Sequence, residues 1–208
     1  MVIGDFGGTE HRPYTTAIQR KLARATKKVS RGLNTQFTVS TGDNFYHYGV
    51  KSVRDKRFQV AYTRHSHRWF MPHLYYSLQI KAQYSGLIVQ FIVLDTYPLY
   101  KYKPSKKQMQ WLKDVLEAST ADYKIVISHY PIYSAGKHGS TGHFFATLKP
   151  IIHEYKVDIF LAGHDHDLQH IQHTEMSQRV DYIGETFCPL PTTGSQSDSE
   201  QLQISPCT

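Results

Sequence analysis

Short runs of apolar, mostly β-branched residues recur along the chain, and this pattern predicts buried β-strands. Four of these runs end directly at a carboxylate, a phenol or an imidazole group. The four runs and the residues after them are 1–4 before Asp5, 37–40 before Thr41-Gly42-Asp43-Asn44-Phe45-Tyr46, 124–128 before His129, and 157–163 before His164-Asp165-His166. Open α/β sheets bind ligands at the carboxyl ends of their strands. The pattern therefore predicts an α/β fold with one site where these strand ends meet.

Helical and strand patterns alternate along the rest of the chain, as is typical of α/β proteins. Residues 87–94 form a continuous apolar run that predicts a buried core strand. Ser105 is placed to cap a helix that runs to Ala118. We expect a second helix over residues 144–155 and a short, mostly solvated one over residues 51–58.

Length and composition suit one globular domain followed by a tail. The chain has 208 residues, of which 40% are hydrophobic and 20% charged. No run approaches the roughly 20 apolar residues that a membrane-spanning helix needs. After residue 184 the composition shifts to Ser, Thr, Gln and Pro, so we expect a domain over 1–184 and a disordered tail over 185–208. The two cysteines, Cys188 and Cys207, both lie in this tail and decide little about the compartment.

The net charge of +7 favours anionic partners, and much of the positive charge lies on one stretch. Apolar residues recur there at helical spacing, which predicts an amphipathic helix with a basic, solvated face. Docking of a polyanion on this face is the alternative, although no nucleic-acid motif accompanies the charge. The basic residues are Arg20, Lys21, Arg24, Lys27, Lys28 and Arg31, and the apolar ones are Ile18, Leu22, Ala25 and Val29.

The imidazole pair after the fourth run is the strongest candidate for metal binding. A His-x-His pair on a glycine turn can direct His164 and His166 toward neighbouring metal ions. Asp165 or Asp167 can orient the second ring nitrogens of these histidines. Two incidental loop histidines are the alternative, which the carboxylates at the other strand ends disfavour.

The other strand-end groups indicate a metal site only when they are considered together. Taken alone, Asp5 and Asp43 would be turn carboxylates and His129 a structural histidine. A carboxylate such as Asp43 can bridge two metal ions, and a phenolate oxygen such as that of Tyr46 suits ferric iron. A separate histidine patch, which no strand edge presents and which we expect to serve the surface or packing, consists of His65, His67 and His73.

The motifs Gly-Asp-Phe-Gly-Gly, Gly-Asp-Asn-Phe-Tyr, Ser-His-Tyr-Pro and Gly-His-Asp-His occur in this order and resemble those of the calcineurin-like metallophosphoesterases. They are most similar to the tartrate-resistant (purple) acid phosphatases. Most metallophosphoesterases carry a histidine where this chain has Gly7, and Tyr46 is the purple-phosphatase variation. The resemblance extends from residue 1 to about residue 184. It implies a four-layer sandwich of two mixed β-sheets flanked by helices.

The resemblance also implies an acid phosphatase that hydrolyses phosphomonoesters, in small molecules or phosphoproteins, by attack of a metal-bound hydroxide. Its binuclear centre would hold Fe(III) together with Fe(II), Zn(II) or Mn(II), since two close ions can clamp a phosphate and activate water. His138 matches the loop histidine that contacts phosphate and assists protonation of the leaving group. The implied ligands are Asp5, Tyr46 and His166 for ferric iron, Asp43 as the bridge, and His129 and His164 for the divalent ion.

Family members are secreted or lysosomal, whereas this sequence begins within the first predicted strand and shows no signal peptide. We expect a monomer with no specific nucleic-acid partner and no membrane span.

The chain departs from the family where a Gly-Asn-His motif is expected, because its only asparagines are Asn34 and Asn44. Family-like sequence resumes near residue 61, so we expect one strand–helix unit to be missing. A divalent-metal ligand and an acid–base histidine would be lost with it, and such a histidine is typically worth about 10²–10⁴ in rate. Two alternatives therefore stay open. One is a non-catalytic, iron-binding remnant or a splice or truncation product, and the other is a basic interaction module built on residues 20–31.

Overall fold

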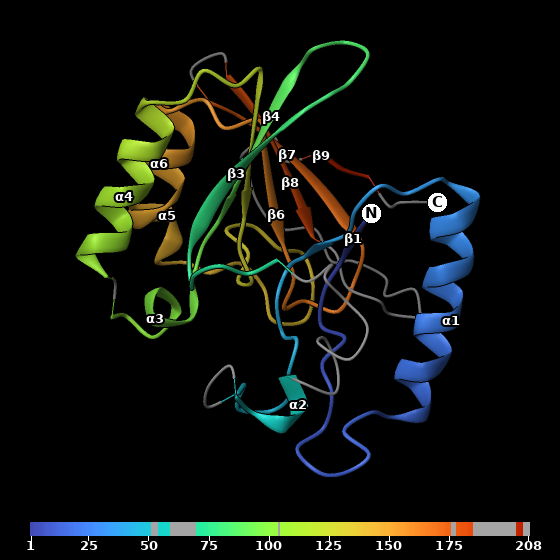
Figure 1. Cartoon of the computed structure of the whole chain (residues 1–208). Helices are drawn as coiled ribbons and strands as arrows, with labels where there is room; N and C mark the ends of the chain where they lie inside the picture. Colours follow the sequence, from blue (N-terminus) through green and yellow to red (C-terminus); the bar gives the residue numbers. More distant parts are fainter. Residues whose placement is uncertain (51–53, 59–69, 104, 176–177, 185–202, 206–208) are drawn as a thin grey trace.

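The computed structural model describes residues 1–50, 54–58, 70–103, 105–175, 178–184 and 203–205, and Figure 1 shows their arrangement. The main element is a mixed sheet in the order β3-β4-β5-β6-β8-β7-β9. The pairs from β4 through β5 and β6 to β8 are parallel, and the outer pairs are antiparallel. In chain order the strands are β3 (Tyr76–Lys81), β4 (Ile88–Val93), β5 (Tyr123–Ile127), β6 (Ile159–Ala162), β7 (Gln169–Glu175), β8 (Gln178–Gly184) and β9 (Gln203–Ser205).

A second, smaller sheet pairs β1 (Val2–Ile3) in parallel with β2 (Val39–Ser40). It packs on one face of the large sheet, because Val2 and Val39 join an apolar cluster around Phe91, Ile127 and Leu161. Removing these side chains from water stabilises the docking of the two sheets.

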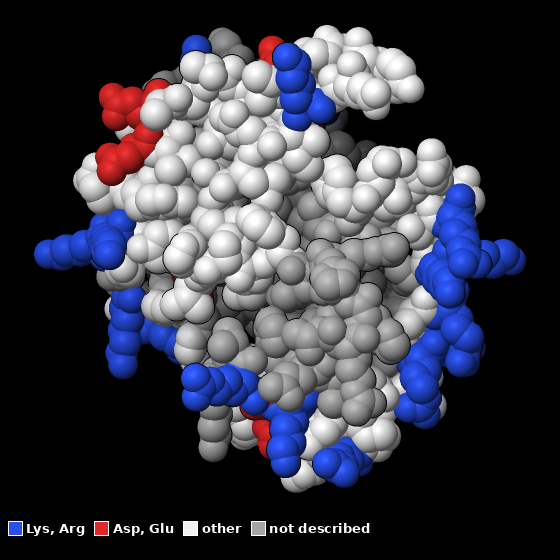
Figure 2. Space-filling view, viewed as in Figure 1, with Lys and Arg blue, Asp and Glu red and all other residues white. Residues whose placement is uncertain are grey.

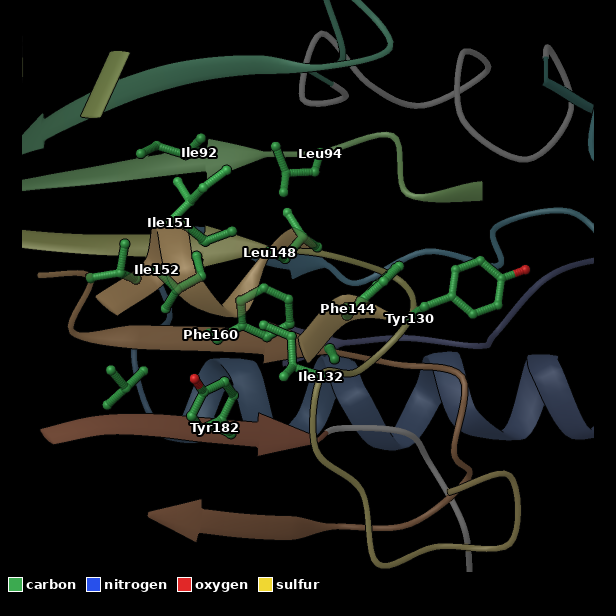
Figure 3. Packing of buried hydrophobic residues seen from close by; sticks show 14 of the residues in the cluster. Ile92, Leu94, Tyr130, Ile132, Phe144, Leu148, Ile151, Ile152, Phe160 and Tyr182 are labelled. Carbon is green, nitrogen blue, oxygen red and sulfur yellow. The ribbon is translucent and has the colours of Figure 1, made fainter. Parts of the chain in front are cut away.

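Four helices cover the opposite face of the large sheet, at the left in Figure 1: α3 (Tyr97–Tyr100), α4 (Lys106–Glu117), α5 (Phe144–Thr147) and α6 (Lys149–Glu154). Figure 3 shows how side chains of the strands, such as Ile92 and Phe160, pack toward Leu148 and Ile152 of the helical layer. All four side chains are at most 1% exposed, so this interface is the main hydrophobic core.

On the far side of the small sheet lies α1 (Ala17–Gly32), at the right in Figure 1. Its N-terminus carries a capping box, in which Thr16 Oγ1 accepts a hydrogen bond from Gln19 N and Gln19 Oε1 accepts one from Thr16 N. The layers thus run from α4–α6 through the large sheet and the small sheet to α1. The predicted α/β architecture, with two sheets flanked by helices, is confirmed.

Local predictions hold for the core strand, β4, and for α4, where Ser105 Oγ accepts the Gln108 N–H at 3.3 Å. The single helix expected over 144–155 is instead two, α5 and α6. Pro150 explains the division, because it has no N–H to donate and is tolerated in the first turn of α6 rather than in a helix interior.

Several predictions fall partly outside the described residues. Of the short helix expected over 51–58, only α2 (Lys56–Phe58) is helical among the described residues. Arg54 and Asp55 are described and lie outside the helix, and residues 51–53 are not described. The region of the expected missing strand–helix unit includes residues 59–69, which contain His65 and His67 and are not described either. β9 lies within the tail expected to be disordered, most of which is outside the described range. Among the described residues, no helix is both long and apolar enough to cross a membrane.

Candidate metal centre

Asp5 and Asp43 lie in the loops that follow β1 and β2. Both residues have positive φ angles, 55° for Asp5 and 48° for Asp43, and Gly42 before Asp43 has a φ of 113°. These left-handed conformations turn the chain sharply at each strand end. The Asp5 N–H donates to the Gly42 carbonyl oxygen at 3.1 Å. The parallel pairing of β1 and β2 thus continues into the loops and brings both carboxylates to one edge.

His129 follows β5, and Gly163 follows the neighbouring strand β6. The Gly163 N–H donates to the His129 carbonyl oxygen at 3.0 Å, which holds the two loops together. On the His129 ring, Nδ1 lies 3.1 Å from the Thr41 carbonyl oxygen and Nε2 lies 3.4 Å from Asp43 Oδ1. A proton on Nδ1 would be donated to that carbonyl, which leaves the Nε2 lone pair directed at the carboxylate edge.

The Asp5 carboxylate is the centre of the site. Its side chain is only 2% exposed, and both of its oxygens accept from the backbone N–H of His164, at 3.2 and 3.1 Å. The Tyr46 hydroxyl donates to Asp5 Oδ1 at 3.4 Å, and His166 Nε2 lies 3.5 Å from the same oxygen. One buried carboxylate therefore joins the loops that follow β1, β2 and β6.

The donor atoms of Asp5, Asp43 and His129 lie within 4.8 Å of one another, a spacing that could hold a metal ion. Tyr46 and His166 flank Asp5, and the ring centroids of His129 and His164 are 5.3 Å apart. The structure thus brings the six predicted ligands into one region, and metal binding by each of them stays a prediction. Carboxylate and phenol oxygens with imidazole nitrogens form a donor set that fits iron, zinc or manganese.

Two glycines allow this close approach of loops. A Cβ atom at Gly163 would lie 2.6 Å from Asp5 Oδ2 and 3.0 Å from Thr41 Oγ1. At Gly42 it would lie 2.7 Å from His129 Nδ1. Any other residue at these positions would displace a predicted ligand.

Burial and neighbouring charges perturb two of the predicted ligands in opposite directions. Burial, with the nearby carboxylates of Asp5 and Asp43, raises the pKa of the Tyr46 hydroxyl well above its ordinary value of 10.0. Burial, with the charges of His129 and His138, lowers the pKa of His164 below its ordinary value of 6.5. His164 is thus kept in the neutral form that binds metals, whereas ionisation of Tyr46 requires a strongly attracting cation.

His138 lies on the loop after β5 with its side chain exposed, and its ring centroid is 4.7 Å from that of His164. Asp165, which is 1% exposed, anchors this loop. Its carboxylate accepts hydrogen bonds from His138 N at 2.7 Å, from Gly139 N at 3.1 Å and from the Ser134 hydroxyl.

These bonds correct the expectation that Asp165 or Asp167 orients the second nitrogens of His164 and His166. After Gly163 the chain turns tightly, since Asp165 N donates to Gly163 O at 2.9 Å, and the Asp165 side chain meets the 134–139 loop instead. Asp167 Oδ1 accepts a hydrogen bond from Gln169 Nε2 at 2.8 Å. Neither carboxylate is hydrogen-bonded to a histidine ring within the described part of the chain.

Sequence reasoning does not identify an aromatic pair beside His164. Tyr130 and Tyr100 stack with ring centroids 3.9 Å apart and an interplanar angle of 2°. The Tyr130 ring centroid lies 4.6 Å from that of His164. Tyr130 could have been identified from the sequence, because it directly follows the predicted ligand His129. Its stacking partner Tyr100, from α3, could not be inferred from spacing.

Comparisons with known proteins show the family to which the chain belongs. The family model for calcineurin-like phosphoesterases matches residues 57–168. The chain is 31% identical to the tartrate-resistant acid phosphatase type 5 of Rattus norvegicus, over 83% of this chain and 67% of that protein. It thus spans about two thirds of the length of this relative.

Two solved structures are similar in fold. The Plasmodium protein described as GAP50, the anchor in the inner membrane complex, has a TM-score of 0.72 at 20% identity, with 98% of this chain and 76% of that chain covered. The purple acid phosphatase PPD1 from yellow lupin (Lupinus luteus) seeds has a TM-score of 0.54 at 14% identity, with 93% and 46% covered. At these identities the likeness concerns the fold alone.

Proposed function

The chain belongs to the calcineurin-like phosphoesterase family, and from this premise we propose that it is an acid phosphatase with a binuclear metal centre that hydrolyses phosphomonoesters. Its homologues are acid phosphatases, and this relationship supports hydrolysis of phosphoesters by a metal-dependent phosphatase. The observation that carries the proposal is the buried Asp5 carboxylate, which lies within 3.5 Å of Tyr46, His164 and His166.

The proposed ligands form two groups, one for each metal ion, with Asp43 between them. Asp5, Tyr46 and His166 would hold ferric iron, which is supported by the position of the last two beside Asp5 Oδ1. Asp43 would bridge, and its closeness to His129 supports a divalent site formed by His129 with His164. When bound, the two ions would supply positive charge that holds a phosphate group and lowers the pKa of water.

His138 is proposed to act on the substrate. It belongs to a loop fixed by Asp165, yet its side chain is exposed beside His164. An imidazole in this position can donate a proton to the leaving oxygen. The stacked rings of Tyr130 and Tyr100 lie beside the His164 ring, with centroids 4.6 and 5.9 Å from it.

A non-catalytic relative that only binds iron is the second candidate, and the missing Gly-Asn-His motif favours it. Of the two asparagines in the sequence, Asn34 follows the end of α1, where its N–H donates to the Arg31 carbonyl oxygen, and Asn44 Oδ1 accepts a hydrogen bond from Ser40 Oγ at 2.7 Å. The Asn44 carbonyl group is therefore already engaged. This candidate predicts metal binding without turnover.

The test is hydrolysis of p-nitrophenyl phosphate at mildly acidic pH by folded, iron-reconstituted protein. We expect turnover, and we expect Asp43→Ala to lower it by more than about 100-fold. Removal of a metal ligand should lower activity more than removal of a residue that only hydrogen-bonds to a ligand. Asp114→Ala, an exposed carboxylate on α4, is the matched control and should keep full activity. Turnover that survives Asp43→Ala would refute the assignment. A folded, iron-loaded chain without turnover would identify the non-catalytic relative.

A further inference from the structure

The helix α1 carries a dense positive charge that the metal centre does not use. Six of its residues are Lys or Arg, and residues 17–32 contain no Asp or Glu. All six are exposed, and Figure 2 shows Lys and Arg side chains along the edge of the molecule where α1 lies in Figure 1. They are Arg20, Lys21, Arg24, Lys27, Lys28 and Arg31.

This charge is free to meet an external partner. Arg20 donates to the carbonyl oxygen and the hydroxyl of Thr15, at 3.3 and 3.2 Å. In the part of the chain that the structure describes, the other five basic side chains make no hydrogen bond or ion pair. No acidic group among the described residues therefore neutralises these charges.

Apolar side chains on α1 are exposed beside the basic ones. Ile18 is 74% exposed, Val29 is 52% exposed, and Leu33, directly after the helix, is 73% exposed. Within α1, which is described completely, Leu22 is the only buried residue. Residues three or four apart are neighbours on a helix surface, so Lys21 lies next to Ile18 and the basic and apolar stripes share an edge.

We propose that α1 is a docking surface for a lipid membrane that contains anionic headgroups. An interfacial helix needs a Lys- and Arg-rich face beside apolar side chains, and α1 presents both to solvent. The positive charge is complementary to anionic lipids, and each Lys or Arg near such a surface strengthens attraction. A nucleic acid or another polyanion would use the same charges, but it would leave Ile18, Val29 and Leu33 in water. The exposed apolar side chains therefore favour the membrane.

Docking through α1 would also orient the metal centre. The Gln19 side chain donates a hydrogen bond to the carbonyl oxygen of Phe6, the residue after Asp5. The capping box fixes Gln19 at the first turn of the helix. A membrane-bound α1 would thus hold the Asp5 loop at a set position relative to the lipid surface.

The test is co-sedimentation of the full chain with phosphatidylcholine vesicles that do or do not contain phosphatidylserine. We expect binding only to the anionic vesicles, and its loss at about 1 M salt, where the Debye length falls to about 3 Å. The triple variant K21E/R24E/K28E should lower the bound fraction at least about tenfold. The matched control K106E/K107E alters two exposed lysines on α4 and should bind as the parent does.

A second variant separates the membrane from other partners. I18S/V29S should weaken vesicle binding and leave heparin binding unchanged, because a polyanion does not need the apolar side chains. Heparin binding without vesicle binding would overturn the proposal in favour of a polyanion. Failure to bind both, or a dimer that I18S/V29S dissociates in sedimentation velocity, would also overturn it. None of these measurements depends on the phosphatase activity, so the two proposals can fail separately.

Discussion

Three of the predicted ligands have backbone conformations that residues other than glycine rarely adopt. Asp5, Asp43 and His164 have φ angles of 55°, 48° and 71°. Such conformations typically cost about 1–3 kcal/mol each and persist where the surrounding structure enforces them. Their occurrence at three strand ends that meet at one place is an independent sign that this edge of the sheets is the functional site.

Replacing Gly163 by alanine should separate the Asp5 carboxylate from the backbone that binds it, because the added Cβ would lie 2.6 Å from Asp5 Oδ2. We expect Gly163→Ala to lower the affinity for Zn(II) or Mn(II) by roughly 10–100-fold in isothermal titration. Gly142→Ala is the control, since its added Cβ would meet nothing within 4 Å. Equal affinities in the two variants would contradict this account of the Asp5 position.

Asp165 should fix the loop that carries His138, because it binds two backbone N–H groups and the Ser134 hydroxyl of that loop. Asp165→Asn replaces one acceptor oxygen by a donor, and we expect tryptic cleavage after the exposed Lys137 to become several-fold faster. The rate is read by mass spectrometry on the metal-free protein. Asp114→Asn, on the surface of α4, should cleave at the parent rate. An unchanged rate in Asp165→Asn would show that the loop does not depend on this carboxylate.

At the scale of elements, α4 offers a clean test of local stability. Ser105 Oγ accepts the Gln108 N–H, so Ser105→Ala leaves a helix N–H without its acceptor. We expect a loss of about 1 kcal/mol in the free energy of unfolding, measured in urea. Ser77→Ala, an exposed position on β3, should change stability much less. A loss of the same size in both variants would argue against a specific capping effect.

The hairpin of β7 and β8 should respond to acid through Asp181. Burial acts to raise the pKa of this carboxyl, but hydrogen bonds from Arg179 at 3.0 Å and from His170 at 3.2 Å, with their charges, lower it below its ordinary value of 3.8. Its contribution to stability is therefore present above about pH 4 and is lost as the pH falls through the lowered pKa.

Thermal unfolding of Asp181→Asn should test this. The variant should melt below the parent at about pH 5, and the two midpoints should converge as the pH falls below the lowered pKa, where the carboxyl is protonated in both states. Asp114→Asn should follow the parent at each pH. A constant difference between parent and Asp181→Asn down to the lowest pH would exclude this ion pair as the cause.

The sequence predicts β4, β5, β6 and α4 because each has a strong apolar pattern and a clear boundary. It does not predict β7, whose buried Gln169 and His173 hide the apolar signal of a strand. The meeting of Asp5, Asp43, His129 and His164 follows from the rule that sites lie at strand ends. The direction of the Asp165 side chain and the exposure of Ile18 on α1 depend on turn geometry and layer packing, which periodicity does not contain.

At the scale of the whole molecule, the site joins the two sheets. Asp5 and Asp43 come from the small sheet, and His129 and His164 come from the large one. A ligand that binds only the assembled site stabilises the folded state, by about 2.7 kcal/mol at a free concentration 100 times its Kd.

Metal loading should therefore raise the melting temperature. For a chain of this size we expect an increase of roughly 5–10 °C on saturation with metal, and its reversal by a chelator. Asp43→Ala should melt at one temperature with or without metal. If the melting temperature of the parent protein did not change with metal, the predicted ligands would not form a site that spans the two sheets.

The hydrogen bond from His164 to Asp5 connects residues 159 positions apart. At a synthesis rate of about 5–20 residues per second, Asp5 is made roughly 10–30 s before His164. During that interval the nascent β1 and β2 lack the β6 surface on which they pack. They also lack His164 and His166, which lie beside the Asp5 carboxylate in the folded protein. A ribosome that stops before residue 163 would release a chain unable to assemble the centre, so metal loading distinguishes chains translated past β6 from those that are not.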